Sequence, residues 1–241
     1  MKIKVLLCAL LAGTLAMADE LLSETVKTYS WMSKSGYSVK MVSPEVGQLM
    51  SQLILAKSQQ TMGIPLAVKI RNFELTSDIL NGLSAKVGLD IPDEATRNQM
   101  EAQLNQMLTT MGFSKVMADC SIGAIAKLTE YLGKNASAFT QTAESNDVVA
   151  QYSCETPNMS LMGNMSVSKI LVNVNKQYKI IPAIRFDFSD GSAILVQFSH
   201  DMVDGRACPL RMILRHTIKQ ISGGMKLPQT VNAAFSDYKF K

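Results

Sequence analysis

The spacing of apolar residues in this sequence changes near residue 145, and that change constrains the fold more than any other feature. Over most of the chain before it, apolar residues recur every three or four positions, whereas after it they alternate with polar residues. The first spacing is typical of helices and the second of half-buried strands. Helices followed by several strands form an α+β pattern. We therefore expect one α+β domain over residues 19–241, with a candidate internal boundary in the polar segment 135–147.

Helices dominate the first half of this expected fold. Ser43-Pro44-Glu45 has the cap, the proline and the acidic residue that open a helix, and Gly63 would end it. Short alternating runs at 37–41 and 65–75 predict strands. Two further helices, over 92–111 and 114–132, are joined by a very short connection, so we expect them to pack as an antiparallel helical hairpin. Their apolar stripes indicate core packing, although a cofactor or partner groove is the alternative.

Antiparallel strands dominate the second half. Runs at 148–154, 167–174, 178–188 and 192–199 are rich in Ile, Val and Phe, and Asp190-Gly191 predicts a tight turn between the last two. A final helix is expected from Cys208-Pro209 onward, packed on the sheet, with a C-terminal edge strand after it. Its other face would carry Arg211, Arg215 and Lys219, as a solvated face or as a basic strip facing a ligand.

The first eighteen residues have the layout of a cleavable export signal. Lys2 and Lys4 precede the apolar run Val5–Leu15, and Ala16-Met17-Ala18 predicts cleavage after Ala18. A run of about 11 residues is too short to span a membrane, which takes about 20. No later segment is apolar enough either. We therefore expect a soluble periplasmic or secreted domain with no transmembrane segment after cleavage.

Charge and motifs exclude several classes of function. The formal net charge of +4 falls to +2 once Lys2 and Lys4 are removed, which does not favour a nucleic-acid partner. The sequence contains no HExxH, no glycine-rich phosphate loop and no CxxC, and we expect no cofactor.

Three cysteines remain after cleavage, Cys120, Cys154 and Cys208. An oxidising compartment favours one disulfide among the three pairings. We favour Cys154–Cys208, because Cys120 lies on the apolar face of a predicted helix.

The segment Ser199-His200-Asp201-Met202-Val203-Asp204-Gly205 contains the candidate catalytic residues. A carboxylate four residues after His200 could orient its imidazole. The spacing His-x-x-x-Asp-Gly after a strand is similar to part of the active-site signature of chloramphenicol acetyltransferase-type acyltransferases, with Ser199 in place of that family's first histidine. The resemblance implies that His200 deprotonates an acceptor hydroxyl and that Asp204 holds the local structure.

Met159, Met162 and Met165 form a candidate metal site at a spacing of three, around a flexible Gly163. Thioethers are soft ligands that select Cu(I). Packing of these methionines into the core is the alternative.

Together these patterns favour an exported, non-enzymatic module that binds an amphipathic ligand or a protein partner. The chain has 16 methionines, which suit an adaptable apolar site, and we expect that site between the helical hairpin and the sheet. An acyltransferase or hydrolase using His200 with Asp204, and Cu(I) binding by the three methionines, remain the alternatives.

Overall fold

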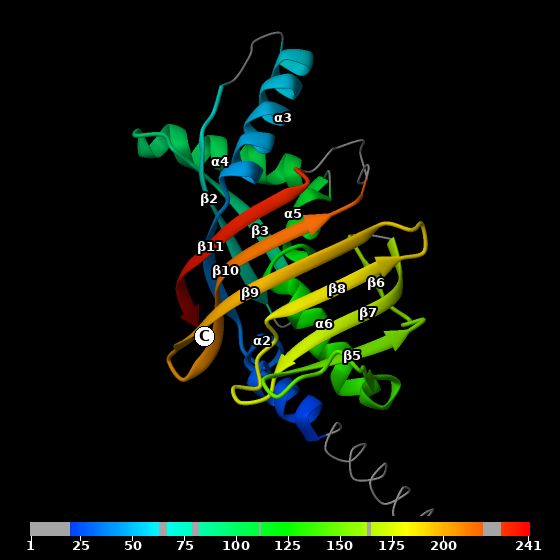
Figure 1. Ribbon diagram of the computed structural model, residues 1–241. Helices are drawn as coiled ribbons and strands as arrows, with labels where there is room; N and C mark the ends of the chain where they lie inside the picture. Colours follow the sequence, from blue (N-terminus) through cyan, green and yellow to red (C-terminus); the bar gives the residue numbers. More distant parts are fainter. Residues whose placement is uncertain (1–19, 63–66, 79–81, 111, 163–164, 219–227) are drawn as a thin grey trace, which may run out of the picture.

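One antiparallel sheet forms the framework of the protein (Figure 1). The computed structural model describes residues 20–62, 67–78, 82–110, 112–162, 165–218 and 228–241, so the predicted signal at 1–18 lies outside the described residues. Within them, eleven strands form the sheet in the order β3-β2-β1-β11-β10-β9-β8-β7-β5-β4, with β6 paired to β7 off this path. The strands are β1 (Tyr37–Val42), β2 (Ile70–Asp78), β3 (Gly82–Leu89), β4 (Thr140–Gln141), β5 (Val149–Glu155), β6 (Ser160–Leu161), β7 (Met165–Asn175), β8 (Ala183–Phe188), β9 (Ala193–Val203), β10 (Arg206–His216) and β11 (Thr230–Phe240).

The helices are concentrated on one face of this sheet, which we call the inner face; the opposite one is the outer face. In Figure 1 the viewer looks at the outer face, with α5 and α6 behind the strands and α3 projecting beyond the ends of β10 and β11. The helices are α2 (Trp31–Lys34), α3 (Pro44–Met62), α4 (Glu94–Thr110), α5 (Phe113–Asp119) and α6 (Ile122–Asn135), with a helical segment at 20–28 and a 3-10 turn at Ala136–Ala138. None of the described helices is both long and apolar enough to cross a membrane.

Alternation along the strands separates the core from the outer face. On β9, Val196 and Phe198 are buried, while Gln197 and Ser199 between them are exposed. The buried side chains of the strands and of α6 join one apolar core. Since side chains alternate between the two faces of a strand, the inner face packs on the helices and the outer face meets solvent.

Several predicted elements are present. Helix α3 begins at Pro44, and the Ser43 hydroxyl accepts a hydrogen bond from the Val46 N–H at 3.4 Å, as a cap does. The turn before β9 contains Gly191 with a φ of 82°, and its N–H donates to the Phe188 carbonyl at 3.0 Å. The coarse expectation of a mixed fold with a large antiparallel sheet and a few helices is therefore confirmed.

The predicted C-terminal helix is wrong, because residues 206–216 form strand β10. Met212 and Leu214 are buried, whereas Arg211, Ile213 and Arg215 are exposed, so this segment alternates with a period of two. A spacing of four between Arg211 and Arg215 fits both the helical period and the strand period. Lys219 lies outside the described residues.

Two further expectations are corrected. The C-terminal strand β11 is not an edge strand, since it lies between β1 and β10. The second helix of the expected hairpin is divided into α5 and α6 at Cys120-Ser121, and α4 and α5 both contact β3. Strand β3, which was not among the strands predicted from the sequence, is the terminal strand of the sheet next to β2.

Gly123 permits the sharp junction between α5 and α6. A Cβ atom at this position would collide with the Ala118 carbonyl oxygen and would lie 2.8 Å from Leu83 Cδ2. Only a residue without a side chain therefore allows the backbone of α6 to approach the end of α5 this closely.

We expect Gly123→Ala to destabilise the fold by about 2 kcal/mol, because the added methyl overpacks a site closed by backbone. The matched control is Gly133→Ala in the same helix, where the new Cβ would make an ordinary contact of 3.5 Å with Val26. That control should be neutral or stabilising, because alanine favours a helix over glycine. Urea unfolding followed by circular dichroism measures both variants, and equal midpoints would contradict this account of the junction.

Candidate functional site

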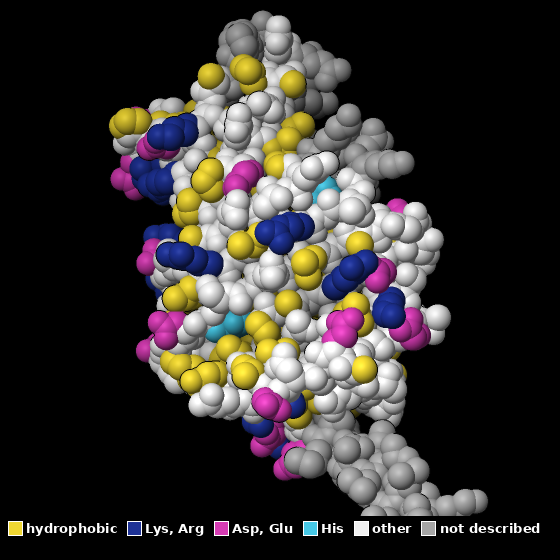
Figure 2. Space-filling model, in the orientation of Figure 1, with side chains coloured by type: hydrophobic (Ala, Val, Ile, Leu, Met, Phe, Trp, Pro, Cys, Tyr) yellow, Lys and Arg dark blue, Asp and Glu magenta, His cyan; other side chains and the backbone are white. Residues whose placement is uncertain are grey.

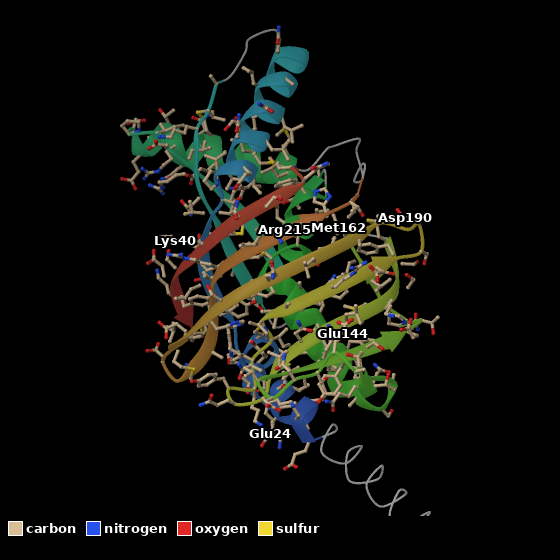
Figure 3. All side chains as sticks on the ribbon, viewed as in Figure 1. Glu24, Lys40, Glu144, Met162, Asp190 and Arg215 are labelled. Atoms are coloured by element: carbon tan, nitrogen blue, oxygen red, sulfur yellow. The ribbon has the colours of Figure 1, made fainter. Side chains whose placement is uncertain are left out.

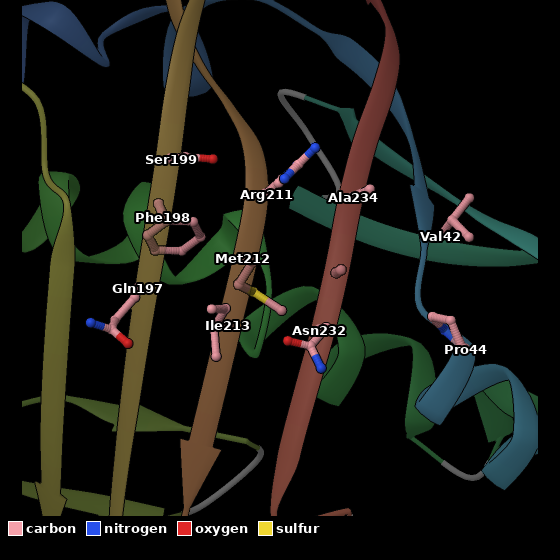
Figure 4. A pocket seen from close by; sticks show the side chains of 11 residues that line it. Val42, Pro44, Gln197, Phe198, Ser199, Arg211, Met212, Ile213, Asn232 and Ala234 are labelled. Carbon is pink, nitrogen blue, oxygen red and sulfur yellow. The ribbon is translucent and has the colours of Figure 1, made fainter.

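A groove of about 770 Å³ lies on the outer face across β9, β10 and β11, where β1 passes into α3 (Figure 4). Two rows of paired residues form its floor. In the first row Arg211 lies opposite Ser199 on one side and Ala234 on the other, and Ala234 in turn lies opposite Val42. In the second row Ile213 lies between Gln197 and Asn232. The register of four strands therefore places a single charge among uncharged side chains, some apolar and some polar.

The surface of the groove is largely apolar. Val42 and Ile213 are 45% and 36% exposed, which is high for side chains of this kind, and Pro44 of α3 adds to the wall. Figure 2 shows hydrophobic side chains on this face between separate basic and acidic ones. Ser199 and Ala234 are too small to fill the space beside Arg211, so the sheet is hollowed there.

Arg211 is the cationic residue in this groove. Within the described residues, no carboxylate lies at ion-pair distance from its guanidinium group. The nearby acid Glu45 is engaged elsewhere, since its Oε1 accepts a 2.6 Å hydrogen bond from Asn232 Nδ2. Partial burial opposes ionisation of Glu45, but the hydrogen bonds from Asn232 and Ser43 outweigh it and lower the pKa of this carboxyl. Arg211 thus offers its donors to solvent or to a ligand.

Between the described strands and α5, the expected location of the site contains a small void. Behind the same strands, the inner face and α5 enclose a void of only about 20 Å³, whose lining includes Met41, Met117, Cys120 and Leu214. Met212 lines both this void and the outer groove. Met41, Met117 and Met212 are buried here as core residues, and of these two described spaces only the outer groove is large enough for a ligand.

His200 lies on β9 and is hydrogen-bonded to Tyr29, which directly follows the helical segment 20–28. Its Nε2 is 2.8 Å from Tyr29 Oη, and that oxygen accepts the Ile181 N–H at 2.9 Å. Because Tyr29 already accepts one bond, its own proton can be donated to Nε2, which puts the imidazole proton on Nδ1. Nδ1 is buried and has no partner within the described residues. Burial lowers the pKa of His200 from 6.5 to about 4.

Asp204 lies at the tip of the β9–β10 hairpin and not at the imidazole. Asp204 and Gly205 both have positive φ, 49° and 73°, which is the backbone of a tight two-residue turn. The Asp204 carbonyl oxygen accepts a 3.3 Å bond from Arg206. The Asp-Gly pair therefore shapes a hairpin here, and His200 takes its orientation from Tyr29.

The three candidate metal-ligating methionines lie on the β6–β7 hairpin. Leu161 pairs with Met165, and the Val167 N–H donates to the Met159 carbonyl at 2.9 Å, so Met159 and Met165 share one face. Met162 is buried in the turn, and its N–H donates to the buried carboxylate of Asp119 at 3.1 Å. Gly163 lies outside the described residues.

The predicted Cys154–Cys208 disulfide is absent, and both thiols are free and buried. Cys154 is on β5 and Cys208 on β10, with β7, β8 and β9 between them in the sheet. Four strand spacings separate the cysteines by on the order of 19 Å, whereas the Cα atoms of a disulfide lie within about 7 Å. Sequence distance could not show this separation.

Arg211 was predicted on a helix face, and Ser199, Ile213 and Asn232 were not predicted as its neighbours. The signal that was present is the alternation of Arg211, Ile213 and Arg215 with Met212 and Leu214.

The sequence matches no protein-family model, and no curated protein matches it. Three solved structures are similar over most of their length. A domain from Vibrio parahaemolyticus described as an outer membrane lipoprotein-sorting protein domain has 11% identity and a TM-score of 0.46, covering 92% of each chain. A DUF1329 family protein from Desulfovibrio piger has 10% identity and a TM-score of 0.45, covering 94% of this chain and 92% of its own. A LolA superfamily protein from Nitrosomonas europaea has 12% identity and a TM-score of 0.38, covering 91% and 93%. Similarity at this level places the chain in no family.

The Tyr29–His200 contact predicts an acid-dependent loss of stability. The unfolded chain takes up a proton at His200 near pH 6.5, whereas the folded chain takes it up only near pH 4. Acidification across this window therefore favours unfolding, by on the order of 3 kcal/mol, and the effect levels off below pH 4. Urea unfolding between pH 4 and 8 measures it, with His200→Gln as the reference that does not titrate. Parallel stability curves for the two proteins would contradict the burial of a neutral imidazole.

Proposed function

We propose that this chain is an exported, non-enzymatic module that binds an amphipathic anion in the outer groove. The observation that carries the proposal is one unpaired arginine, Arg211, on the floor of an open and otherwise largely apolar groove. The acidic headgroup of the ligand would bind Arg211, and its apolar chain would lie over Ile213 and Val42.

The size and composition of the groove support this ligand class. A volume of about 770 Å³ falls in the range of about 300–1,000 Å³ that is typical of small-molecule sites. Such sites combine apolar walls with a few polar groups that fix orientation. Removing Ile213 and Val42 from water is favourable by about 25 cal/mol for each Å² of apolar surface that is buried.

The headgroup chemistry follows from the guanidinium group. Arginine binds planar carboxylates and phosphates with two parallel hydrogen bonds, which is stronger than a single neutral bond. Ser199 lies directly opposite Arg211 in the β9–β10 register, where its hydroxyl can add a third bond to the same group. The predicted export signal at residues 1–18 is consistent with this proposal, because an exported chain would bind its ligand outside the cytoplasm.

We expect Arg211→Gln to weaken binding of dodecanoate and of dodecyl phosphate about tenfold each, or by about 1.4 kcal/mol, while dodecanol binding stays unchanged. Calorimetric titration below the micelle concentration measures all three, and the ratio of the two anions distinguishes a carboxylate from a phosphate headgroup. Ile213→Asn should weaken all three ligands, because the apolar contact is common to them.

The matched control is Arg215→Gln, the next exposed arginine on β10, which Figure 3 labels on the same face. Its neighbours in register are Leu195 and Thr230, which do not line the groove. If Arg215→Gln lost as much affinity for the two anions as Arg211→Gln does, the anions would be bound by nonspecific attraction to positive charge. No binding of any of the three ligands by the unaltered protein would refute the proposal.

A further inference from the structure

Strand β3 ends one side of the main sheet, and side chains of α4 occupy its free edge. Asn105 bonds both backbone groups of Val87: its Oδ1 accepts the Val87 N–H at 2.7 Å, and its Nδ2 donates to the Val87 carbonyl at 3.3 Å. Glu101 Oε1 accepts the Leu89 N–H at 2.8 Å. The helix thus satisfies outward backbone groups that a further strand would otherwise pair.

These bonds reproduce the pattern of an antiparallel neighbour. In such a pair, one residue exchanges both its N–H and its C=O with the residue opposite, and a carboxamide carries the same donor and acceptor. Four residues of helix advance about 6 Å, and two residues of strand advance about 6.8 Å, so Glu101 and Asn105 match Leu89 and Val87 in spacing. Glu101 bonds Leu89 and Asn105 bonds Val87, so residue numbers rise along α4 as they fall along β3. Helix α4 therefore runs antiparallel to this strand.

Four apolar side chains attach α4 to the core: Leu104 and Leu108 are buried, and Met100 and Met107 pack partly against it. The other described side chains of the helix are mainly polar and exposed. A helix that is polar on most sides gains little from packing and opens at low free energy. Gly112, just beyond its end, has a φ of 72° and open space around it, which allows the chain to change direction there.

We infer that the β3 edge is a strand-addition site for an extended segment of a partner protein, which replaces α4. The groups that α4 would release are backbone donors and an acceptor two residues apart, which an extended polypeptide pairs and a lipid or a nucleic acid does not. Ala85, Val87 and Leu89 are buried on the inner side of β3, so the segment should carry an apolar residue at every second position. The site is distinct from the outer groove and does not depend on it.

The experiment compares the unaltered chain with Glu101→Ala/Asn105→Ala, which uncovers the edge. The matched control is Gln103→Ala/Gln106→Ala on the exposed side of the same helix. The probe is a labelled peptide with the sequence of β2, IRNFELTSD, which already alternates as a neighbour of β3 on its other edge. A peptide with proline at alternate positions lacks the necessary N–H donors and serves as the negative probe.

We expect fluorescence anisotropy to show at least tenfold tighter binding of the β2 peptide by the uncovered variant than by the unaltered chain or the glutamine control, and none of the proline peptide. In the unaltered chain at saturating peptide, hydrogen exchange should rise in 94–110 while the amides of Val87 and Leu89 stay protected. Equal binding by all three proteins, or unchanged exchange in α4, would overturn the inference.

Dimerisation of the uncovered variant without peptide binding would assign the edge to a second copy and would also overturn it. If the double variant does not fold, Asn105→Asp provides the same comparison. The aspartate keeps an acceptor for the Val87 N–H but cannot donate to the Val87 carbonyl, so peptide binding should still rise above that of the unaltered chain.

Discussion

The alternation of side chains along long antiparallel strands is the constraint on which the rest of this protein depends. Over 193–199 of β9, 211–216 of β10 and 230–235 of β11, every second residue enters the core and the residues between them face away from it. The same register that buries Met212 and Leu214 brings Arg211 beside Ser199 and Ala234 on the other face. The packing of the core and the composition of the groove are therefore two consequences of one strand register.

The helices complete the inner face with a small number of specific contacts. Tyr29 links the N-terminal helical segment both to His200 on β9 and to the backbone at Ile181. At the same end of the sheet, Glu24 forms a 3.1 Å ion pair with Lys179 (Figure 3). Farther along, the buried Asp119 joins α5 to Lys127 on α6 and to the turn at Met162. A buried carboxylate of this kind is stabilising only because both its charge and its lone pairs are satisfied.

The two faces of the sheet also differ in the spaces that the described residues form. On the inner face, the void enclosed beside α5 is about 20 Å³, which is far smaller than a ligand. In the part of the chain that the structure describes, no helix lies over β9 to β11 on the outer face, and the small residues there leave an open groove. The edge strand β3 has backbone groups that no neighbouring strand pairs. Side chains of α4 form hydrogen bonds with the N–H groups of Val87 and Leu89 there.

Local elements whose sequence signals have one interpretation could be predicted without the structure: the start of α3 at Ser43-Pro44, the turn at Asp190-Gly191, and the alternation of β5, β7 and β9. Strand β10 could not be predicted in this way, because a spacing of four between Arg211 and Arg215 fits both the helical and the strand period. The distance between Cys154 and Cys208 could not be predicted either. The sequence spacing placed His200 beside Asp204, whereas the fold pairs His200 with Tyr29, 171 residues away. Strand order, strand register and side-chain partners depend on contacts between distant segments, and these emerge only when the chain is folded. Local spacing fixes the face of the strand to which a side chain points, but it does not fix which residue lies opposite.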